Sequence, residues 1–572
     1  MRRLQHQFRD ELIIIGIHSG KFLNEKFTSN IQQAVIKLGI EHPVVNDPDF
    51  FIWQQYAIKA WPTLVLINPH GKIVSEISGE ILADPFAHTI EDLIYEHHDQ
   101  IDRTPLVLRN ESIKINKSCF QYPSKLIFNH TNKRLYLSDT GNHRIVEINI
   151  NNDNKSGEVY RVFGNGNPGL QDGIADEIKF NQPHGLALSG DNKSLFVADT
   201  ENHVIRAIDL NEGYVNTIAG KGEKAHSFIK KGNPLEMPLR SPWAIDSFGK
   251  YLFIAMAGSH QIWVLIDNNE LFPFAGNGRE ALIDGPITEA SFNQPSDIRF
   301  KDNVLYIADT EASAIRMITL NKPSITKTII GQGLFEFGDR DGSLDQAQLQ
   351  HPAGIDIQRN RLFIADTYNH KIKTLDLHTN QLVTLAGNGK PGDINGPLEQ
   401  AKLNEPEGVL ILNDYLYITD TNNHKLKVID LNINEIEEFK IFGTEKLILN
   451  NKFPIQTIAL NPIEICPGET SVYFDIKLPK GFIRNKNAPS SIIRKDVNPE
   501  RVLYIDESNR VVIKLNDLSD TKINLELKVY YCLDSSYDVC FIHNKRIILP
   551  ININLHAQPV SFTTYTIDKE LI

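Results

Sequence analysis

The chain has 572 residues, a formal net charge of −12 and a hydrophobic content of 41%, values typical of a soluble globular protein. The acidic balance argues against a nucleic-acid partner or an anionic membrane surface, and no apolar run is long enough for a transmembrane helix. Four cysteines are too few for a disulfide scaffold, so we expect a cytoplasmic location.

Residues 1–100 alternate strand-like and helix-like segments. An apolar β-branched run at 11–19 predicts a buried strand, and residues 24–38 carry apolar side chains at helical spacing. Two further strands flank the Asn-Pro-His-Gly turn at 68–71, and residues 84–97 predict a closing helix. This order, with Trp61-Pro62-Thr63 opening a strand, resembles the thioredoxin fold. The resemblance implies a cis peptide bond before Pro62, whereas Pro62 is otherwise an ordinary proline at a strand start.

The thioredoxin family places a first strand and a Cys-x-x-Cys helix ahead of the strand seen here at 11–19. Only about ten residues precede that strand, and no cysteine occurs before Cys119. Residues 1–100 are therefore a truncated, redox-inactive thioredoxin-like domain, or Met1 is not the true start. We expect no dithiol oxidoreductase activity from this chain. Residues 101–118 lack a clear periodicity and are interpreted as a linker.

Residues 119–446 contain six copies of one phrase, in forms such as SLFVADTENHVI at 194–205 and RLFIADTYNHKI at 361–372, with a period of about 56 residues. A proline opens each unit, the Asp-Thr step ends its second strand, an Asn-His turn leads into the third strand, and the fourth ends in glycine. Short antiparallel strands repeated in this way predict a six-bladed β-propeller, and the fold class is mainly β.

The Asp-Thr-x-Asn-His phrase is the signature of NHL repeats. Together with GIHSGKF, HPVVND and WPTLV in the first hundred residues, it resembles the NHL-repeat-containing protein 2 family. That resemblance implies a thioredoxin-like domain, a six-bladed NHL propeller and a C-terminal β-sandwich. It covers nearly the whole chain.

The repeated polar side chains are interpreted as structural, because an Asp or Asn at a strand end satisfies backbone N–H groups in the turn. Recurrence in several blades also favours structure over a single active site. The repeated aspartates are Asp139, Asp199, Asp309, Asp366 and Asp420. The third unit is degenerate: Met256 and Ala257 replace Asp-Thr. Its long basic loop at 221–242 is either a solvated loop or a docking surface for an acidic partner.

Function is expected where the repeat varies. The residue after each opening proline, beside the central channel, differs in every unit but two: Ser124, His184, Trp243, Ser296, Ala353 and Glu407. We predict that His184, Trp243 and Glu407 contact a ligand or peptide; the alternative is ordinary channel lining. Some related propellers are metal-dependent lyases or hydrolases, but the other positions hold Ser or Ala, so we expect neither a metal nor another cofactor.

Residues 447–557 carry several strand-like runs and predict a β-sandwich, with 558–572 as a tail. Cys532 and Cys540 lie across an apparent hairpin and are a possible thiol pair, close enough for a disulfide but expected to stay reduced in the cytoplasm.

We predict a non-catalytic scaffold that binds a protein or peptide partner through the loop face of the propeller. The alternatives are a thiol–disulfide oxidoreductase, if a longer form carries the missing dithiol, and a metal-dependent propeller lyase or hydrolase.

Overall fold

A computed structural model describes residues 2–79, 83–103, 118–174, 177–225 and 231–447, and, beyond these, the strands of the C-terminal region with a few adjoining residues, between positions 457 and 567. Its contacts divide the chain into two compact units, residues 1–449 and 450–572. The predicted linker at 101–118 lies almost wholly outside the described residues.

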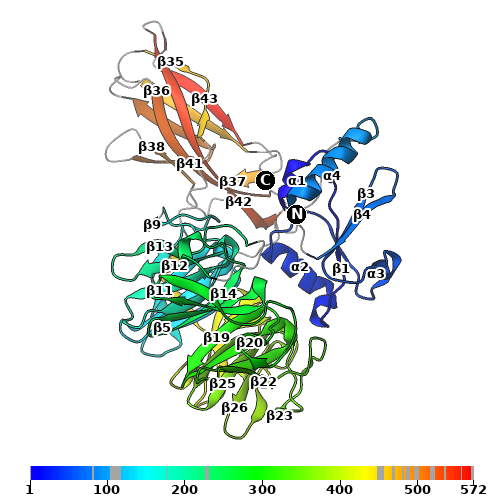
Figure 1. Ribbon diagram of the computed structural model, residues 1–572. Helices are drawn as coiled ribbons and strands as arrows, with labels where there is room; N and C mark the ends of the chain where they lie inside the picture. Colours follow the sequence, from blue (N-terminus) through cyan, green and yellow to red (C-terminus); the bar gives the residue numbers. More distant parts are fainter. Residues whose placement is uncertain are drawn as a thin grey trace. The chain divides into compact units, whose positions relative to one another are not determined.

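The N-terminal part of the first unit contains helices and two small sheets (Figure 1). Its elements are α1 (Arg2–Gln7), β1 (Gly16–His18), α2 (Thr28–Lys37), β2 (Val44–Asn46), α3 (Phe51–Gln55), β3 (Thr63–Ile67), β4 (Ile73–Ser78) and α4 (Ala83–Glu96). β1 pairs with β2 in parallel and β3 with β4 antiparallel, as two separate sheets. The strand predicted at 11–19 is therefore much shorter than expected. The peptide bond between Trp61 and Pro62 is cis. The likeness to thioredoxin stays a prediction.

Within the described residues, six antiparallel sheets follow one another, each built from four consecutive strands. In blades 1 to 3 these are β5 (Pro123–Asn129), β6 (Arg134–Asp139), β7 (Arg144–Ile150) and β8 (Ser156–Phe163); β10 (Pro183–Leu188), β11 (Ser194–Asp199), β12 (Val204–Asp209) and β13 (Tyr214–Ala219); β14 (Pro242–Phe248), β15 (Tyr251–Met256), β16 (Gln261–Ile266) and β17 (Glu270–Ala275).

Blades 4 to 6 repeat this plan. Their strands are β19 (Pro295–Lys301), β20 (Val304–Asp309), β21 (Ala314–Thr319) and β22 (Ile325–Ile330); β24 (Pro352–Gln358), β25 (Arg361–Asp366), β26 (Lys371–Asp376) and β27 (Gln381–Ala386); β29 (Pro406–Leu412), β30 (Tyr415–Asp420), β31 (Lys425–Asp430) and β32 (Glu435–Glu438). The first strand of each blade contacts the first strands of its two neighbours, and β29 returns to β5. The ring is therefore closed, and the mainly β, six-bladed propeller predicted from the repeats is confirmed.

Most blades carry a fifth, short outer strand that the four-strand repeat did not predict. The Gly- and Asp-rich loops supply β9 (Gly173–Ile174), β18 (Gly285–Pro286), β23 (Gly342–Ser343) and β28 (Gly396–Pro397), each pairing with the fourth strand of its blade. In blade 1 the outer strand is β33 (Lys440–Phe442), which follows blade 6 in sequence and pairs in parallel with β8. This pairing joins the end of the propeller to its beginning.

The repeated aspartates lie inside the blades, fully buried. In blade 4, Asp309 Oδ1 accepts the backbone N–H of Asn293 at 2.6 Å, and Oδ2 lies 2.9 Å from Nη1 of Arg316. Arg206 makes the same ion pair with Asp199, and Lys373 and Lys427 pair with Asp366 and Asp420. In blade 1, Asp139 pairs with Arg144. Each carboxylate thus ties the start of its blade's first strand to the end of the second.

The second unit is all β. It contains β34 (Thr457–Ala459), β35 (Ile463–Ile465), β36 (Thr470–Lys477), β37 (Phe482–Arg484), β38 (Ser491–Arg494), β39 (Arg501–Tyr504), β40 (Arg510–Leu515), β41 (Lys522–Leu533), β42 (Ser536–Ile553) and β43 (Val560–Thr566). A larger sheet is built around β41 and β42 and a smaller one has the order β40-β36-β43, with one buried apolar cluster spanning both.

Two of the sequence predictions concern this unit. The prediction that residues 558–572 form a tail is wrong in part, because residues 560–566 form β43 and pair with β36 in parallel. Alternating buried positions such as Tyr565 give this segment a core-facing side. The backbones of Cys532 and Cys540 lie directly opposite each other in the β41–β42 pair, but their side chains lie outside the described residues.

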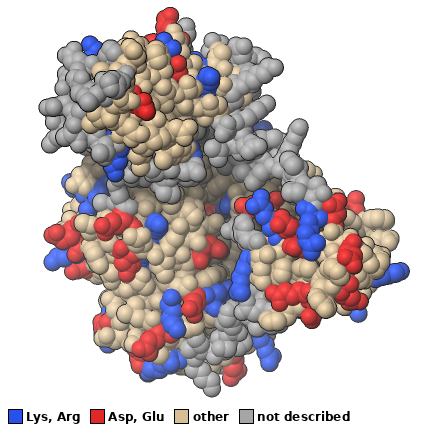
Figure 2. All heavy atoms as spheres, turned by 90° about the horizontal axis from the view of Figure 1, so that it is seen from above, with Lys and Arg blue, Asp and Glu red and all other residues tan. Residues whose placement is uncertain are grey.

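The described helices are all too short or too polar to cross a membrane. Lys and Arg side chains lie among Asp and Glu on the face shown in Figure 2, and neither sign gathers into one large patch there.

A candidate binding cavity at the channel mouth

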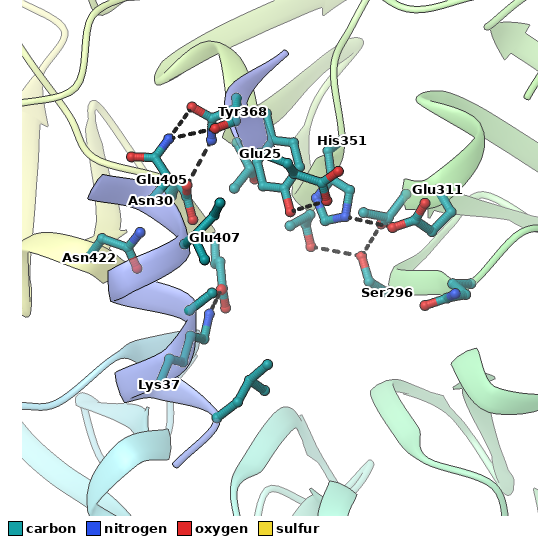
Figure 3. Close-up of a pocket in the computed structure, with 18 of the residues that line it drawn as sticks. Glu25, Asn30, Lys37, Ser296, Glu311, His351, Tyr368, Glu405, Glu407 and Asn422 are labelled. Carbon is teal, nitrogen blue, oxygen red and sulfur yellow. Dashed lines mark hydrogen bonds and ion pairs between the residues drawn. The ribbon is translucent and has the colours of Figure 1, made fainter. Parts of the chain in front are cut away.

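A cavity of about 400 Å³ lies within the first unit, between the N-terminal part and the channel mouth of the propeller. Helix α2 forms one wall, contributing Ile31, Ala34, Val35 and Leu38 at helical spacing. The propeller contributes side chains from the starts of the first strands and from the turns after the second strands. Figure 3 shows α2 passing along one side of this space.

The three residues predicted to contact a ligand all line this cavity. The rings of His184 and Trp243 pack against each other at a tilt of 31°, with their centroids 4.4 Å apart. Burial lowers the pKa of His184 to about 3, so the imidazole is neutral. The carboxylate of Glu407 forms an ion pair with the ammonium group of Lys37, on α2, an interaction that the sequence did not predict (Figure 3). Glu407 therefore fastens the helix to the mouth.

A second ring of residues was missed by the sequence reasoning. The residue immediately before each opening proline has a positive φ between 46° and 55°, although none is glycine: Tyr122, Gln182, Ser241, Gln294, His351 and Glu405. Residues with a side chain rarely adopt this left-handed backbone, and because it recurs in all six blades the conformation belongs to the blade structure, whereas the side chains differ from blade to blade. Four of the six line the cavity. The residue type before the proline differs between the six copies, and this variation could have identified the ring. The sequence prediction considered only the residue after the proline.

A third variable position also reaches the cavity. The x of the Asp-Thr-x-Asn-His phrase is Glu311, Tyr368 and Asn422 in blades 4 to 6, and all three line it. His351 stacks face to face on Tyr368 at 4.0 Å and its Nε2 lies 3.1 Å from the Glu311 carboxylate. The non-repeated side chains of three positions therefore meet at one place.

The N-terminal part is anchored on blades 4 to 6. Phe22 is completely buried, with its ring packed against Phe337, His351 and Tyr368. Lys21 donates to the backbone carbonyl of Glu311 at 2.7 Å. Burying a Phe side chain stabilises a contact by about 2 kcal/mol, so this anchor is substantial.

Polar contacts complete the anchor. Asn24 Nδ2 donates to Glu405 at 2.7 Å, and the Tyr368 hydroxyl lies 3.4 Å from Glu25. Burial would raise the pKa of Glu311, but His351 and Lys21 together lower it to about 2. Burial also opposes ionisation of Glu407, but Lys37 lowers its pKa. Both carboxylates are therefore ionised and paired within the fold.

The channel beneath the cavity is crossed by a buried ion pair. Lys125 of β5 reaches Asp297 of β19, with Nζ 2.9 Å from Oδ2, and also donates to the backbone carbonyl of Ala353. Asp297 in turn contacts Arg299 at 3.1 Å. None of these three charged side chains lines the cavity.

The lining was compared with the requirements of a metal site. Within the described ranges, no group of three or more His, Cys, Asp or Glu side chains is placed to hold a metal ion. The hydroxyl of Ser296 is hydrogen-bonded to the hydroxyl of Thr310 and lies 3.2 Å from the backbone carbonyl oxygen of Ala353.

Comparisons with known proteins agree with the interpretation of the repeated phrase as an NHL repeat. The NHL repeat family matches residues 180–207. The chain is 35% identical over 543 residues to NHL repeat-containing protein 2 of Bos taurus, covering 86% of this chain and 74% of that protein. It is 32% identical over 608 residues to the chloroplastic protein SUPPRESSOR OF QUENCHING 1 of Arabidopsis thaliana, covering 99% of this chain and 56% of that protein.

Among solved structures, a structural genomics protein of unknown function from Bacteroides thetaiotaomicron aligns with a TM-score of 0.40 and 14% identity, over 57% of this chain and 70% of that one. The extent and identity of the match to the Bos taurus protein establish the relationship. The chain belongs to the NHL repeat-containing protein 2 family.

Proposed function

We propose that this chain is a non-catalytic binding protein that receives a segment of a protein partner in the channel-mouth cavity. The observation that carries the proposal is the convergence of non-repeated side chains from three positions of the repeat on one cavity with an apolar wall. Ligand sites in proteins are commonly concave and largely apolar, with a few placed polar groups.

The position of the N-terminal part sharpens the predicted site. Its contacts lie over blades 4 to 6 and reach Tyr122 at the start of blade 1, whereas His184 and Trp243 belong to blades 2 and 3. Among the described residues, no hydrogen bond or ion pair joins α2 to these two side chains. A partner would therefore enter over blades 2 and 3 and lie between Trp243 and α2.

The test is affinity capture of partners on the immobilised chain, quantified by mass spectrometry, with the double variant H184A/W243A beside the wild type. We expect at least a tenfold loss of the partner, since aromatic anchors dominate many interfaces. The matched control is Tyr214→Ala, which removes an exposed aromatic ring from the outer strand β13. Retention of the partner at full strength by a folded H184A/W243A variant would place the binding surface elsewhere.

A further inference from the structure

The charged groups around the cavity are already satisfied within the fold. Lys37 pairs with Glu407, and Glu311 is held by Lys21 and His351. Glu405 accepts a hydrogen bond from Asn24. Glu25, the fourth carboxylate of the lining, accepts the backbone N–H of Phe22. An anionic ligand would therefore face these carboxylates, and a cationic ligand would lose its hydration and have to displace their present partners, which is costly in both cases.

Several polar groups of the lining remain without a hydrogen-bond partner, among them the buried atoms Nε2 of His18, Nδ1 of His184 and Oδ1 of Asn422. The indole N–H of Trp243 and the side-chain amides of Gln182 and Gln294 make no hydrogen bond to any described residue, and all three side chains line the cavity. None of the three is fully buried. The two backbone N–H groups of the glutamines are, in contrast, bonded to His143 and His260. The backbone of the two glutamines is therefore held by hydrogen bonds, while the donors and acceptors of their side chains lack partners.

These groups match the chemistry of a peptide backbone. A glutamine amide offers two donors and one acceptor, so it can bond the C=O and the N–H of a peptide unit, and the indole adds a donor for a second carbonyl. The facing wall of α2, with Ile31, Val35 and Leu38, is apolar and suits an aliphatic or aromatic side chain. The propeller side of the cavity thus offers amide and indole groups that lack hydrogen-bond partners, and the facing wall is apolar.

We infer that the cavity selects an uncharged, extended polypeptide segment, recognised by Trp243, Gln182 and Gln294 and by the apolar face of α2. This inference rests on the proposed function and names the class of its ligand. Recognition by neutral groups leaves little Coulomb interaction for salt to screen.

The experiment pans a phage-displayed random peptide library against the full chain and measures the enriched peptide, made synthetically, by calorimetry. We expect its central residues to be free of Asp, Glu, Lys and Arg, and its affinity to change less than about twofold between low and high salt. Trp243→Phe keeps the ring and removes the donor, and Gln182→Ala removes the amide. Each should weaken binding about fivefold, the effect of one hydrogen bond. Gln381→Ala, an exposed glutamine of β27, is the control.

The outcomes separate the two proposals. Peptides that require a charged residue, bind with strong salt dependence and still lose affinity in H184A/W243A would overturn the inference and leave the proposed function standing. Peptides that bind equally to the wild type and to all cavity variants, or a library that yields no enrichment, would overturn both.

Discussion

Blades 3 and 4 are neighbours that have each lost a different part of the repeated phrase. Blade 3 keeps its histidine, His260, but carries Met256 where the others have aspartate. Blade 4 keeps Asp309 but carries Ser313 in place of histidine. Both turns nevertheless have the same backbone, with φ of 54° at His260 and 49° at Ser313. The two halves of the phrase therefore work independently.

The contacts explain this independence. Asp309 acts within its own blade, where it holds Asn293 and Arg316. His260 acts between blades, because its Nδ1 accepts the backbone N–H of Gln294 in blade 4 at 3.3 Å. In blade 4, Ser313 Oγ does the same for the N–H of His351 at 3.2 Å. One residue closes a blade and the other joins it to the next.

In blade 3, two other side chains occupy the positions of the buried ion pair that blade 4 forms between Asp309 and Arg316. Seven residues after Met256, at the position of Arg316, stands Trp263. Both side chains are buried, and the indole N–H donates to Gln261 at 3.1 Å. A buried charge pair can be exchanged for apolar side chains without loss of stability, provided both partners change together. The difference between the blades is therefore a paired exchange.

Asp309→Ala should have the largest effect of the changes considered. It removes the buried one of the two carboxylates that pair with Arg316, leaving only the more exposed Asp284, and it removes the acceptor for Asn293, so we expect a loss of about 4 kcal/mol in the free energy of unfolding. Urea unfolding followed by circular dichroism would measure it. Glu212→Ala, an exposed carboxylate on the turn before β13, is the control and should change stability by less than about 0.5 kcal/mol. A similar small change for Asp309→Ala would contradict the role given to the ion pair.

The histidine half of the phrase makes a prediction about pH. Burial lowers the pKa of His143 to about 4, and its Nδ1 accepts the N–H of Gln182 only while the ring is neutral. Because the folded pKa lies below the unfolded value, this contribution is complete above about pH 6.5 and is lost as the pH falls toward 4, by up to about 3 kcal/mol.

His143→Ser reproduces the natural sequence of blade 4 and removes the titrating group. The stability difference between wild type and His143→Ser should shrink as the pH falls from 6.5 to 4, measured by urea unfolding at each pH. The comparison cancels other titrating groups, such as Asp309, whose pKa burial raises to about 6 against the pull of Arg316. A difference that is constant across this range would mean that His143 is not buried in its neutral form.

The repeat itself allowed the propeller to be predicted, because the alternation, the opening prolines and the Asp-Thr-x-Asn-His turns are local and recur. The ring position of His184 and Trp243 followed from the same periodicity. The partner of Glu407 did not, since Lys37 lies 370 residues away and no local pattern connects α2 to blade 6. The left-handed residues before the prolines were missed for another reason: glycine normally marks such positions, and here none is present.

The smallest expected effect is also the sharpest test of the comparison between blades. The double variant Asp309→Met with Arg316→Trp transfers the apolar pair of blade 3 into blade 4. If the pair is exchangeable, this double variant should lie within about 1.5 kcal/mol of the wild type in urea unfolding, although Asp309→Ala alone loses far more. Residual loss would come from Asp284, which bonds Arg316 at 2.9 Å and would be left with Thr328 alone. A double variant as unstable as Asp309→Ala would show instead that the two blades differ in the shape of their cores, and that the ion pair of blade 4 is fixed by its own surroundings.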